Sequence, residues 1–504
     1  MIKFRTSMTL FFVMLVFILL TGCITEENGY IGYYASDHYV VGDENIDAID
    51  SPETKVVFTG APVHRDNLHW SEGRDRDWEV DIRHFGVLVL RRHPLLVNYG
   101  DIEFVEGLAS RYYSDLAHNA LLERAAAKNE ILVNDADSIR EALREIIVDK
   151  TNELILGIPG FSNYEVKFSL SEIAAILDDV HTYSMFIWDF FERGGILPIH
   201  IRALYDGVYF TGVPREMERA LYGELLAIGG IPIDEVIRRL GRVIPHENAY
   251  NLRETQVPRF LMITEMLKFI GVVCDSNVAD FTIKDTAGEI FDVQVQSIEQ
   301  ATFRYMDDDV FVSRGMGLLM YERPGEDFWH EFLYDDNVMY VRISRFARTV
   351  VVDRAIAELR AELRNWSVEE KIEKLIIDLR GNPGGFPMWP TGIDYPFLSE
   401  MVESLYVIID GGSLSQSVGT TSRLMHNMQH LTIVGEPTGQ AENFFFGGAL
   451  GSLPNSGMSY MVSRAMLVNS NSRDVAIRPD IFIPLTINDI INNRDPVLEF
   501  IVSR

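Results

Sequence analysis

The sequence predicts an α/β protein in which helices cover a mostly parallel sheet. Beyond residue 370, apolar runs at 374–379, 405–409 and 431–434 are separated by glycine-rich turns and by a helical pattern over 417–430. Strands that alternate with helices in this way are typical of a parallel sheet buried on both faces. An N-terminal helical domain and a small β-rich middle segment are expected to precede this sheet domain.

The helical domain is predicted from the spacing of apolar residues. Residues 101–122, 137–153 and 169–180 place them three and four positions apart among charged residues. This spacing favours amphipathic helices. Ser169 or Ser171 is a plausible N-cap for the last of them.

The middle segment changes to short strand-like runs. They occur at 199–201, 208–210 and 225–228, separated by glycine and aspartate. Residues 281–295 read as a hairpin with its turn at Ala287-Gly288. A strand at 339–343 and a helix at 350–363 complete the approach to the parallel sheet.

Composition limits the classes of function. The chain has 504 residues, with 47% hydrophobic and 24% charged, which is typical of a globular protein of two or three subdomains. Its formal net charge of -29 repels nucleic acid, so no nucleic-acid partner is expected. No Cys/His cluster has the spacing of zinc ligands, and we expect no metal or other cofactor.

The N-terminus has the pattern of a bacterial lipoprotein signal. Lys3 and Arg5 precede an uncharged apolar run over 8–20, which is too short for an ordinary membrane span. Leu20-Thr21-Gly22-Cys23 then resembles a lipobox, in which Cys23 would carry the lipid and anchor the chain to a membrane. An ordinary secretory signal or a short anchor is the alternative. We expect a bacterial, extracytoplasmic, membrane-anchored lipoprotein.

These patterns divide the chain into five expected parts. They are a signal peptide over 1–23, an acidic tether over 24–77, the helical domain over 78–195, a mixed and partly PDZ-like segment over 196–300, and the sheet domain over 301–504.

Two glycine-rich turns in the sheet domain carry the candidate chemistry. The first, Asp378-Leu379-Arg380-Gly381-Asn382-Pro383-Gly384-Gly385, follows a buried strand. Glycines there permit positive φ and allow backbone N–H groups to face an anion. The second places Ser413, Ser415 and Ser417 between a strand and a helix, where a hydroxyl lies at the positive end of the helix dipole. Without further context, the first is a structural turn and the second a cluster of N-cap serines.

The two turns resemble the signatures of the tail-specific (C-terminal processing) serine protease family, whose catalytic domain has a ClpP/crotonase-like fold. The tricorn core protease and the repeats of interphotoreceptor retinoid-binding protein are relatives in it. The resemblance, which covers roughly residues 78–504, implies that Ser415 is the nucleophile, with Ser413 and Ser417 as nearby alternatives. It assigns the oxyanion hole to the amides of Gly384, Gly385 and Gln416.

The general base departs from the Ser-Lys pattern of this family. Val434-Gly435-Glu436-Pro437-Thr438-Gly439 resembles another family segment, but no lysine follows it. Asp179-Val180-His181-Thr182 resembles the segment of a branch that uses a histidine from the N-terminal region. A histidine titrates near neutrality and suits proton transfer from a serine, so His181 is the expected base. Glu436 is the candidate for the orienting carboxylate, with Glu442 as second choice.

The resulting prediction is a lipid-anchored serine peptidase that cleaves peptides or proteins through an acyl-enzyme. Because Ser415 and His181 are distant in the sequence, the helical domain must fold back onto the sheet domain. The leading alternative is a non-catalytic pseudo-peptidase that binds a peptide or hydrophobic ligand. A solute-binding lipoprotein ranks last, since the sequence shows no duplicated lobes. The sequence indicates no oligomeric state.

Overall fold

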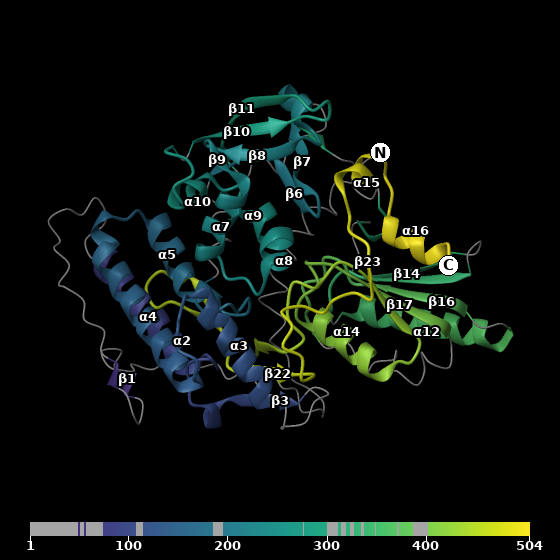
Figure 1. The fold of residues 1–504 in the computed structure, drawn as a ribbon, viewed down its shortest axis with the longest axis horizontal. Coiled ribbons are helices and arrows are strands. Elements are labelled where there is room, and N and C mark those ends of the chain that lie inside the picture. The colour runs from purple at the N-terminus through teal and green to yellow at the C-terminus, as the bar shows by residue number, and fades with distance from the viewer. Residues whose placement is uncertain are drawn as a thin grey trace.

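The structure, a computed structural model, describes most of the chain from residue 74 onward. The described residues are 49–50, 55–56, 74–106, 114–184, 195–275, 277–299, 311–313, 319–322, 327–333, 337–347, 349–369, 372–386 and 402–504. Figure 1 shows a group of helices, a β-rich part beside it, and a sheet flanked by helices, so the expected α/β class is confirmed. Across the described ranges, no helix is both long and apolar enough to cross a membrane. Cys23 lies outside these ranges.

The N-terminal region packs its helices around one apolar core. The helices are α2 (Arg74–Arg92), α3 (Ser114–Lys128), α4 (Ala136–Gly157) and α5 (Asn163–Ala175). Helix α5 begins earlier than expected, because Ser162 and Glu165 form a capping box that satisfies two backbone N–H groups. The predicted caps Ser169 and Ser171 are instead buried inside the helix.

Part of the helix expected over 101–122 is a strand. Residues of β3 (Glu103–Glu106) pair in parallel with β22 (Ala465–Val468), far along the chain, and α3 begins only at Ser114. The helical prediction was wrong there because a tertiary strand pairing outweighed the local pattern, which weighs little in a short segment. Figure 1 shows these two strands side by side beneath the helices.

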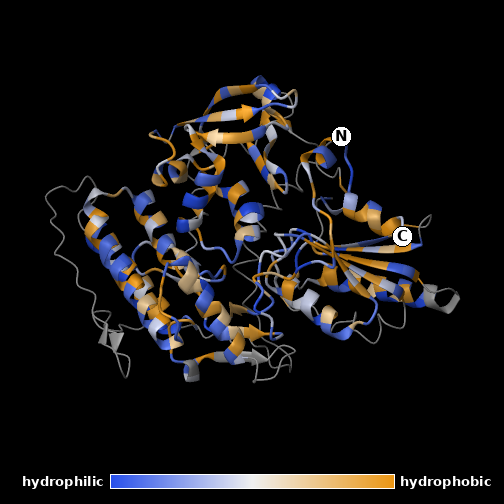
Figure 2. Cartoon of the chain, in the orientation of Figure 1, coloured by the Kyte–Doolittle hydropathy of each residue, from blue (hydrophilic) through white to orange (hydrophobic). Residues whose placement is uncertain are grey.

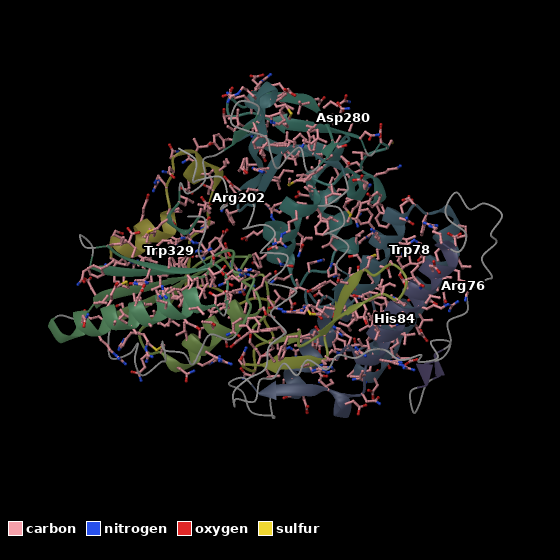
Figure 3. The ribbon with its side chains drawn as sticks, turned by 180° about the vertical axis from the view of Figure 1, so that it is seen from behind. Arg76, Trp78, His84, Arg202, Asp280 and Trp329 are labelled. Atoms are coloured by element: carbon pink, nitrogen blue, oxygen red, sulfur yellow. The ribbon has the colours of Figure 1, made fainter. Side chains whose placement is uncertain are left out.

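The middle region is an antiparallel sheet ordered β11-β10-β8-β7-β13, with β6 also paired to β7. Its strands are β6 (His200–Leu204), β7 (Gly207–Pro214), β8 (Glu224–Ile228), β10 (Val278–Lys284), β11 (Ile290–Gln296) and β13 (Phe311–Ser313). The hairpin expected around Ala287-Gly288 is present between β10 and β11, with Gly288 at φ 87°. Arg202 of β6, labelled in Figure 3, pairs with Glu322 at 2.6 Å.

The C-terminal sheet has the order β14-β15-β16-β17-β18-β23, and every pair except β14–β15 is parallel. Its strands are β14 (Phe328–Leu333), β15 (Val338–Ile343), β16 (Ile372–Asp378), β17 (Val402–Ile409), β18 (Leu431–Gly435) and β23 (Ile481–Phe482). Alternate residues of β16 face opposite layers: Leu375 and Ile377 pack with helices α12 (Val350–Glu369) and α14 (Gln416–Asn427), while Ile376 packs with α16 (Pro496–Val502). Figure 2 shows these strands as predominantly apolar.

A return of the chain from the sheet region to the helices positions the candidate site. After β18, the strands β19 (Phe444–Phe446), β20 (Ala449–Ser452), β21 (Ser459–Val462) and β22 run back along the helical region. Strand β21 pairs with β4 (Tyr183–Ser184), which directly follows the turn containing His181. The sheet region and the turn after α5 are thereby held together by backbone hydrogen bonds.

A buried arginine joins the glycine-rich turn after β16 to the C-terminal helix. Arg380 donates to both carboxylate oxygens of Asp495, at 3.0 and 2.8 Å, and also to Asp378. Its guanidinium lies 3.8 Å from the ring centroid of Tyr321. Burial acts against the charge, but the two carboxylates outweigh it and raise the pKa of Arg380.

Replacing Arg380 by methionine is expected to destabilise the fold by about 3–5 kcal/mol, because two buried carboxylates lose their common partner. Urea unfolding followed by circular dichroism measures the loss. Arg494→Met is the matched control, since Arg494 and Glu499 form an exposed pair, and little change is expected there. Equal stability of the two variants would show that the buried network does not hold the turn.

Candidate active site

Ser415 occupies a strained turn between β17 and α14. Its backbone has φ 52° and ψ -118°, a conformation that non-glycine residues adopt rarely and at a cost of about 1–3 kcal/mol. Its N–H donates to Oε1 of Gln440 at 2.6 Å. Gly384 makes room on the other side, because a Cβ at that position would lie 2.5 Å from the Cβ of Ser415. A sharp strand-to-helix turn of this kind presents the hydroxyl of a nucleophile.

The two alternative serines face the protein interior. Ser413 is fully buried and its Oγ donates to the carbonyl of Leu379 at 2.8 Å. Ser417 is also fully buried, and its Oγ has no hydrogen-bond partner among the described residues. Neither hydroxyl is placed to meet a substrate, so the geometry favours Ser415 among the three.

His181 reaches Ser415 across 234 positions of the chain. Its Nε2 lies 3.1 Å from the Oγ of Ser415, and its ring stacks on Phe444 at a centroid distance of 5.9 Å. Burial lowers the pKa of His181 below its usual value, and the charge of Asp179 partly offsets the effect. The imidazole is therefore neutral, as a general base requires, to a lower pH than an exposed histidine.

Asp179 is the carboxylate beside this imidazole. Its Oδ1 lies 3.8 Å from Nδ1 of His181 and accepts the backbone N–H of the same residue at 2.9 Å. Its Oδ2 accepts from Thr182 Oγ1 at 2.7 Å and lies 3.1 Å from Nε2 of His93. Burial alone would raise the pKa of Asp179, but the hydrogen bond from His93, the largest of the opposing effects, helps to bring it below its usual value. Asp179 is therefore held as an anion facing the ring.

Because Nδ1 of His93 accepts the N–H of Leu95 at 3.2 Å, the neutral His93 ring carries its proton on Nε2 and donates it to Asp179. His93 and His181 thus both lie next to the carboxylate of Asp179, and the hydrogen bond from His93 fixes the orientation of that carboxylate. Such outer partners orient a catalytic group without touching the substrate.

The change Asp179→Asn is expected to lower the rate of reaction at Ser415 by about 100-fold or more, since the imidazolium that forms loses its counter-charge. The acid limb of the pH–rate profile should also move to lower pH, because the charge of Asp179 raises the pKa of His181. The measurement is the rate of labelling by a fluorophosphonate at several pH values.

The adjacent change Asp178→Asn is the control. Asp178 has φ 55°, which asparagine tolerates, and it pairs with Arg124 and Lys128 rather than with His181. Equal losses in both variants would assign the effect of Asp179 to local folding.

Glu436 and Glu442 lie elsewhere and correct the expectation for the orienting carboxylate. Neither is among the described contacts of His181. Glu442 accepts from Ser422, His426 and Ser470. Glu436 lines a separate cavity of about 270 Å³, where burial, reinforced by Asp410, raises its pKa to about 7. The sequence favoured them because they follow Ser415 in a family-like segment, whereas Asp179, whose carboxylate lies 3.8 Å from Nδ1 of His181, precedes that histidine by two residues.

The cavity is separate from the candidate pair. Asp410, Gly412 and Leu414 line it, but neither Ser415 nor His181 does. Glu254 lines it too, and its Oε2 accepts the N–H of Gly411 at 2.9 Å. Its acids therefore support the backbone of the turn that carries Ser415.

Within the described part of the chain, two of the three expected oxyanion donors have amides without an acceptor. The N–H of Gly384 donates to Oδ1 of Asn382 at 2.8 Å and is therefore occupied. No described hydrogen bond uses the N–H of Gly385 or that of Gln416, which begins α14 and has no partner within the helix. Gly385 has φ 125°, and a Cβ there would lie 2.2 Å from the carbonyl oxygen of Phe346. Gly385 and Gln416 are thus left as candidate donors.

Gln440 and Glu247 belong to the site and were not predicted from the sequence. The Nε2 of Gln440 lies 3.1 Å from Oε2 of Glu247 and 3.4 Å from Nδ1 of His181. Both side chains are fully buried. The only signal at position 440 was the absence of a lysine from that segment.

A comparison with protein-family models finds a match in the segment that precedes Ser415. Residues 337–388 match the model of peptidase family S41. This range includes β15, β16 and the turn with Gly384 and Gly385, but neither Ser415 nor His181. None of the curated proteins matches the chain.

Three solved structures are similar at low identity. Mature CPAF is 15% identical with a TM-score of 0.47, over 77% of this chain and 96% of that one. The photosystem II D1 C-terminal processing protease is 12% identical with a TM-score of 0.33, over 72% and 92%. The tricorn protease is 13% identical with a TM-score of 0.35, over 79% of this chain and 37% of that one.

Proposed function

We propose that this chain is a peptidase of family S41 and hydrolyses peptide bonds through an acyl-enzyme on Ser415, with His181 as general base. The observation that carries the proposal is the distance of 3.1 Å between Ser415 Oγ and His181 Nε2. The amides of Gln416 and Gly385, which have no acceptor among the described residues, support it. A nucleophile, a base and a pair of amide donors in one place are the components that acyl transfer requires.

The reaction uses these groups in sequence. Ser415 Oγ attacks the carbonyl carbon of the scissile bond while its proton passes to Nε2 of His181. The amides of Gly385 and Gln416 hold the oxyanion of the tetrahedral intermediate, which is worth about 3–4 kcal/mol per donor in comparable sites. His181 then protonates the leaving amine, and the anionic Asp179 stabilises the imidazolium in the interval. In the second half, His181 takes a proton from water as the water oxygen attacks the acyl carbon. The bond from that carbon to Ser415 Oγ then breaks, His181 returns the proton to Oγ, and the carboxylic acid product leaves.

The fluorophosphonate probe tests this proposal directly, because it phosphonylates only an activated serine. We expect stoichiometric labelling of the wild-type chain, and mass spectrometry of its digest should place the adduct on Ser415. A chain that stays unlabelled, or an adduct on another residue, would remove the proposed nucleophile. In that case the non-catalytic alternative, a protein that binds peptides in the same place, would stand.

The proposed substrates are peptides or proteins outside the cytoplasm of a bacterial cell. Cys23 follows the apolar run over 8–20 in a lipobox-like context, and a lipid on its sulfur would hold the chain at a membrane. Incorporation of labelled palmitate into the wild-type chain, and its loss in Cys23→Ala, is the expected result. Incorporation that persists in the variant would exclude this anchor.

A further inference from the structure

The side chain of Gln440 bridges the nucleophile and the base. Its Oε1 accepts the backbone N–H of Ser415 at 2.6 Å, and its Nε2 lies 3.4 Å from Nδ1 of His181. The chain fixes this orientation, because a backbone N–H can only donate and must therefore face the oxygen of the amide. The nitrogen of the amide is then directed to the ring of His181 and to Glu247.

This orientation determines what the ring of His181 can do. The amide nitrogen carries only donors, so Nδ1 of His181 must accept where the two meet. A neutral imidazole that accepts at Nδ1 carries its proton on Nε2, and Nε2 then donates to Ser415 Oγ instead of accepting from it. A general base needs the other tautomer, with the proton on Nδ1 and directed at Asp179. That carboxylate is at 3.8 Å, so Gln440 and Asp179 compete for the same nitrogen.

The groups around the ring act on its two tautomers in opposite directions. Asp179, itself bound by His93, favours a proton on Nδ1. The carboxylate of Glu247 accepts a hydrogen bond from Nε2 of Gln440 and also pairs with Arg124 at 3.1 Å. Gln440 is thus anchored at both ends of its amide and is not free to turn.

We propose that Gln440 is a positioning residue that holds the backbone amide of Ser415 and, through the other end of the same amide group, sets which ring nitrogen of His181 carries the proton. The inference rests on the proposed function and adds to it a resting state in which the ring donates to the nucleophile. Approach of the Asp179 carboxylate to Nδ1 of His181, from the present 3.8 Å, transfers the ring proton to Nδ1 and produces the base.

The test compares Gln440→Glu with the wild type by ¹⁵N NMR of histidine-labelled protein. There are 12 histidines, and the signal of His181 is the one that disappears in His181→Ala. In the wild type we expect the neutral ring to be protonated on Nε2. In Gln440→Glu the new carboxylate accepts from both Ser415 N–H and Nδ1–H, so the proton should move to Nδ1.

The same variant should move the acid limb of fluorophosphonate labelling upward by about one pH unit or more, since a carboxylate near an imidazole favours its charged form. If Gln440→Glu fails to fold, the exchanged pair Gln440→Glu with Glu247→Gln keeps the same number of buried acids and is measured instead. Gln256→Glu is the control for placing an acid at a buried glutamine, because Gln256 contacts Asn251 and not His181. It should leave both the ring and the acid limb unchanged.

A wild-type ring already protonated on Nδ1, or an unchanged ring and acid limb in Gln440→Glu, would overturn the inference. The NMR result does not depend on hydrolysis. If the proton moves as expected but no variant is labelled at Ser415, the role of Gln440 stands and the proposed peptidase activity fails.

Discussion

Replacing Ser415 by alanine is expected to abolish fluorophosphonate labelling and to lower peptide hydrolysis by at least about 10⁴-fold. The loss should be this large because the two neighbouring serines, Ser413 and Ser417, are fully buried and cannot take over. Alanine keeps the backbone conformation that a serine adopts at φ 52°, so the melting temperature should change little. Cleavage is measured on a pooled peptide library by mass spectrometry.

The control for Ser415→Ala is the same change at Ser417, two residues further into α14. The Ser417 hydroxyl is buried and has no hydrogen-bond partner among the described residues, so its removal should leave labelling and stability near wild type. If Ser417→Ala lost labelling as completely as Ser415→Ala, the effect would come from the start of the helix rather than from a nucleophile.

The sheet region was predictable because its signals are local and agree with one another. Apolar runs bounded by glycine coincide with β16 and β17, and the 431–434 run coincides with β18. The hairpin with Gly288 was predictable for the same reason, since a turn with positive φ favours glycine. In each case residue type, spacing and turn chemistry indicate one structure.

The elements that were missed depend on partners far away in the chain. Strand β3 forms because β22 (Ala465–Val468) pairs with it, and the residues of Glu103–Glu106 alone do not predict this pairing. The start of α5 was misplaced although Ser162 and Glu165 form a recognisable capping box. The first miss is a limit of local reasoning, whereas the second signal was present in the sequence.

In the candidate site too, some residues were predictable from local motifs and others depend on contacts between distant segments. Ser415 and His181 were chosen because of resembling motifs, and the fold brings them within hydrogen-bonding distance. Asp179 was visible in the motif but was not chosen, because the direction of its carboxylate depends on the turn and on His93. Gln440 could not be assigned a role, because its contacts with Ser415 and His181 arise only when two distant segments meet.

Replacing His181 by alanine is expected to lower the labelling rate of Ser415 by about 10²–10⁴-fold, the usual contribution of a general base. The shape of the pH profile should change as well. Burial lowers the pKa of His181 below its usual value of 6.5, so the wild-type rate should hold as the pH falls through 6.5 and decline only at lower pH, where the ring becomes protonated. In His181→Ala that decline should be absent, because the group that titrates is gone.

Imidazole in solution provides a sharper version of this test. The space that the ring leaves next to Phe444, on which it stacks at 5.9 Å, is of the right shape for a free imidazole, which should restore part of the labelling of His181→Ala. His426→Ala is the control, since His426 is 40% exposed and bonds to Glu442, and it should label like the wild type with no response to imidazole. A wild-type acid limb that persists in His181→Ala would assign the base to another group, and the proximity of His181 to Ser415 would then be structural.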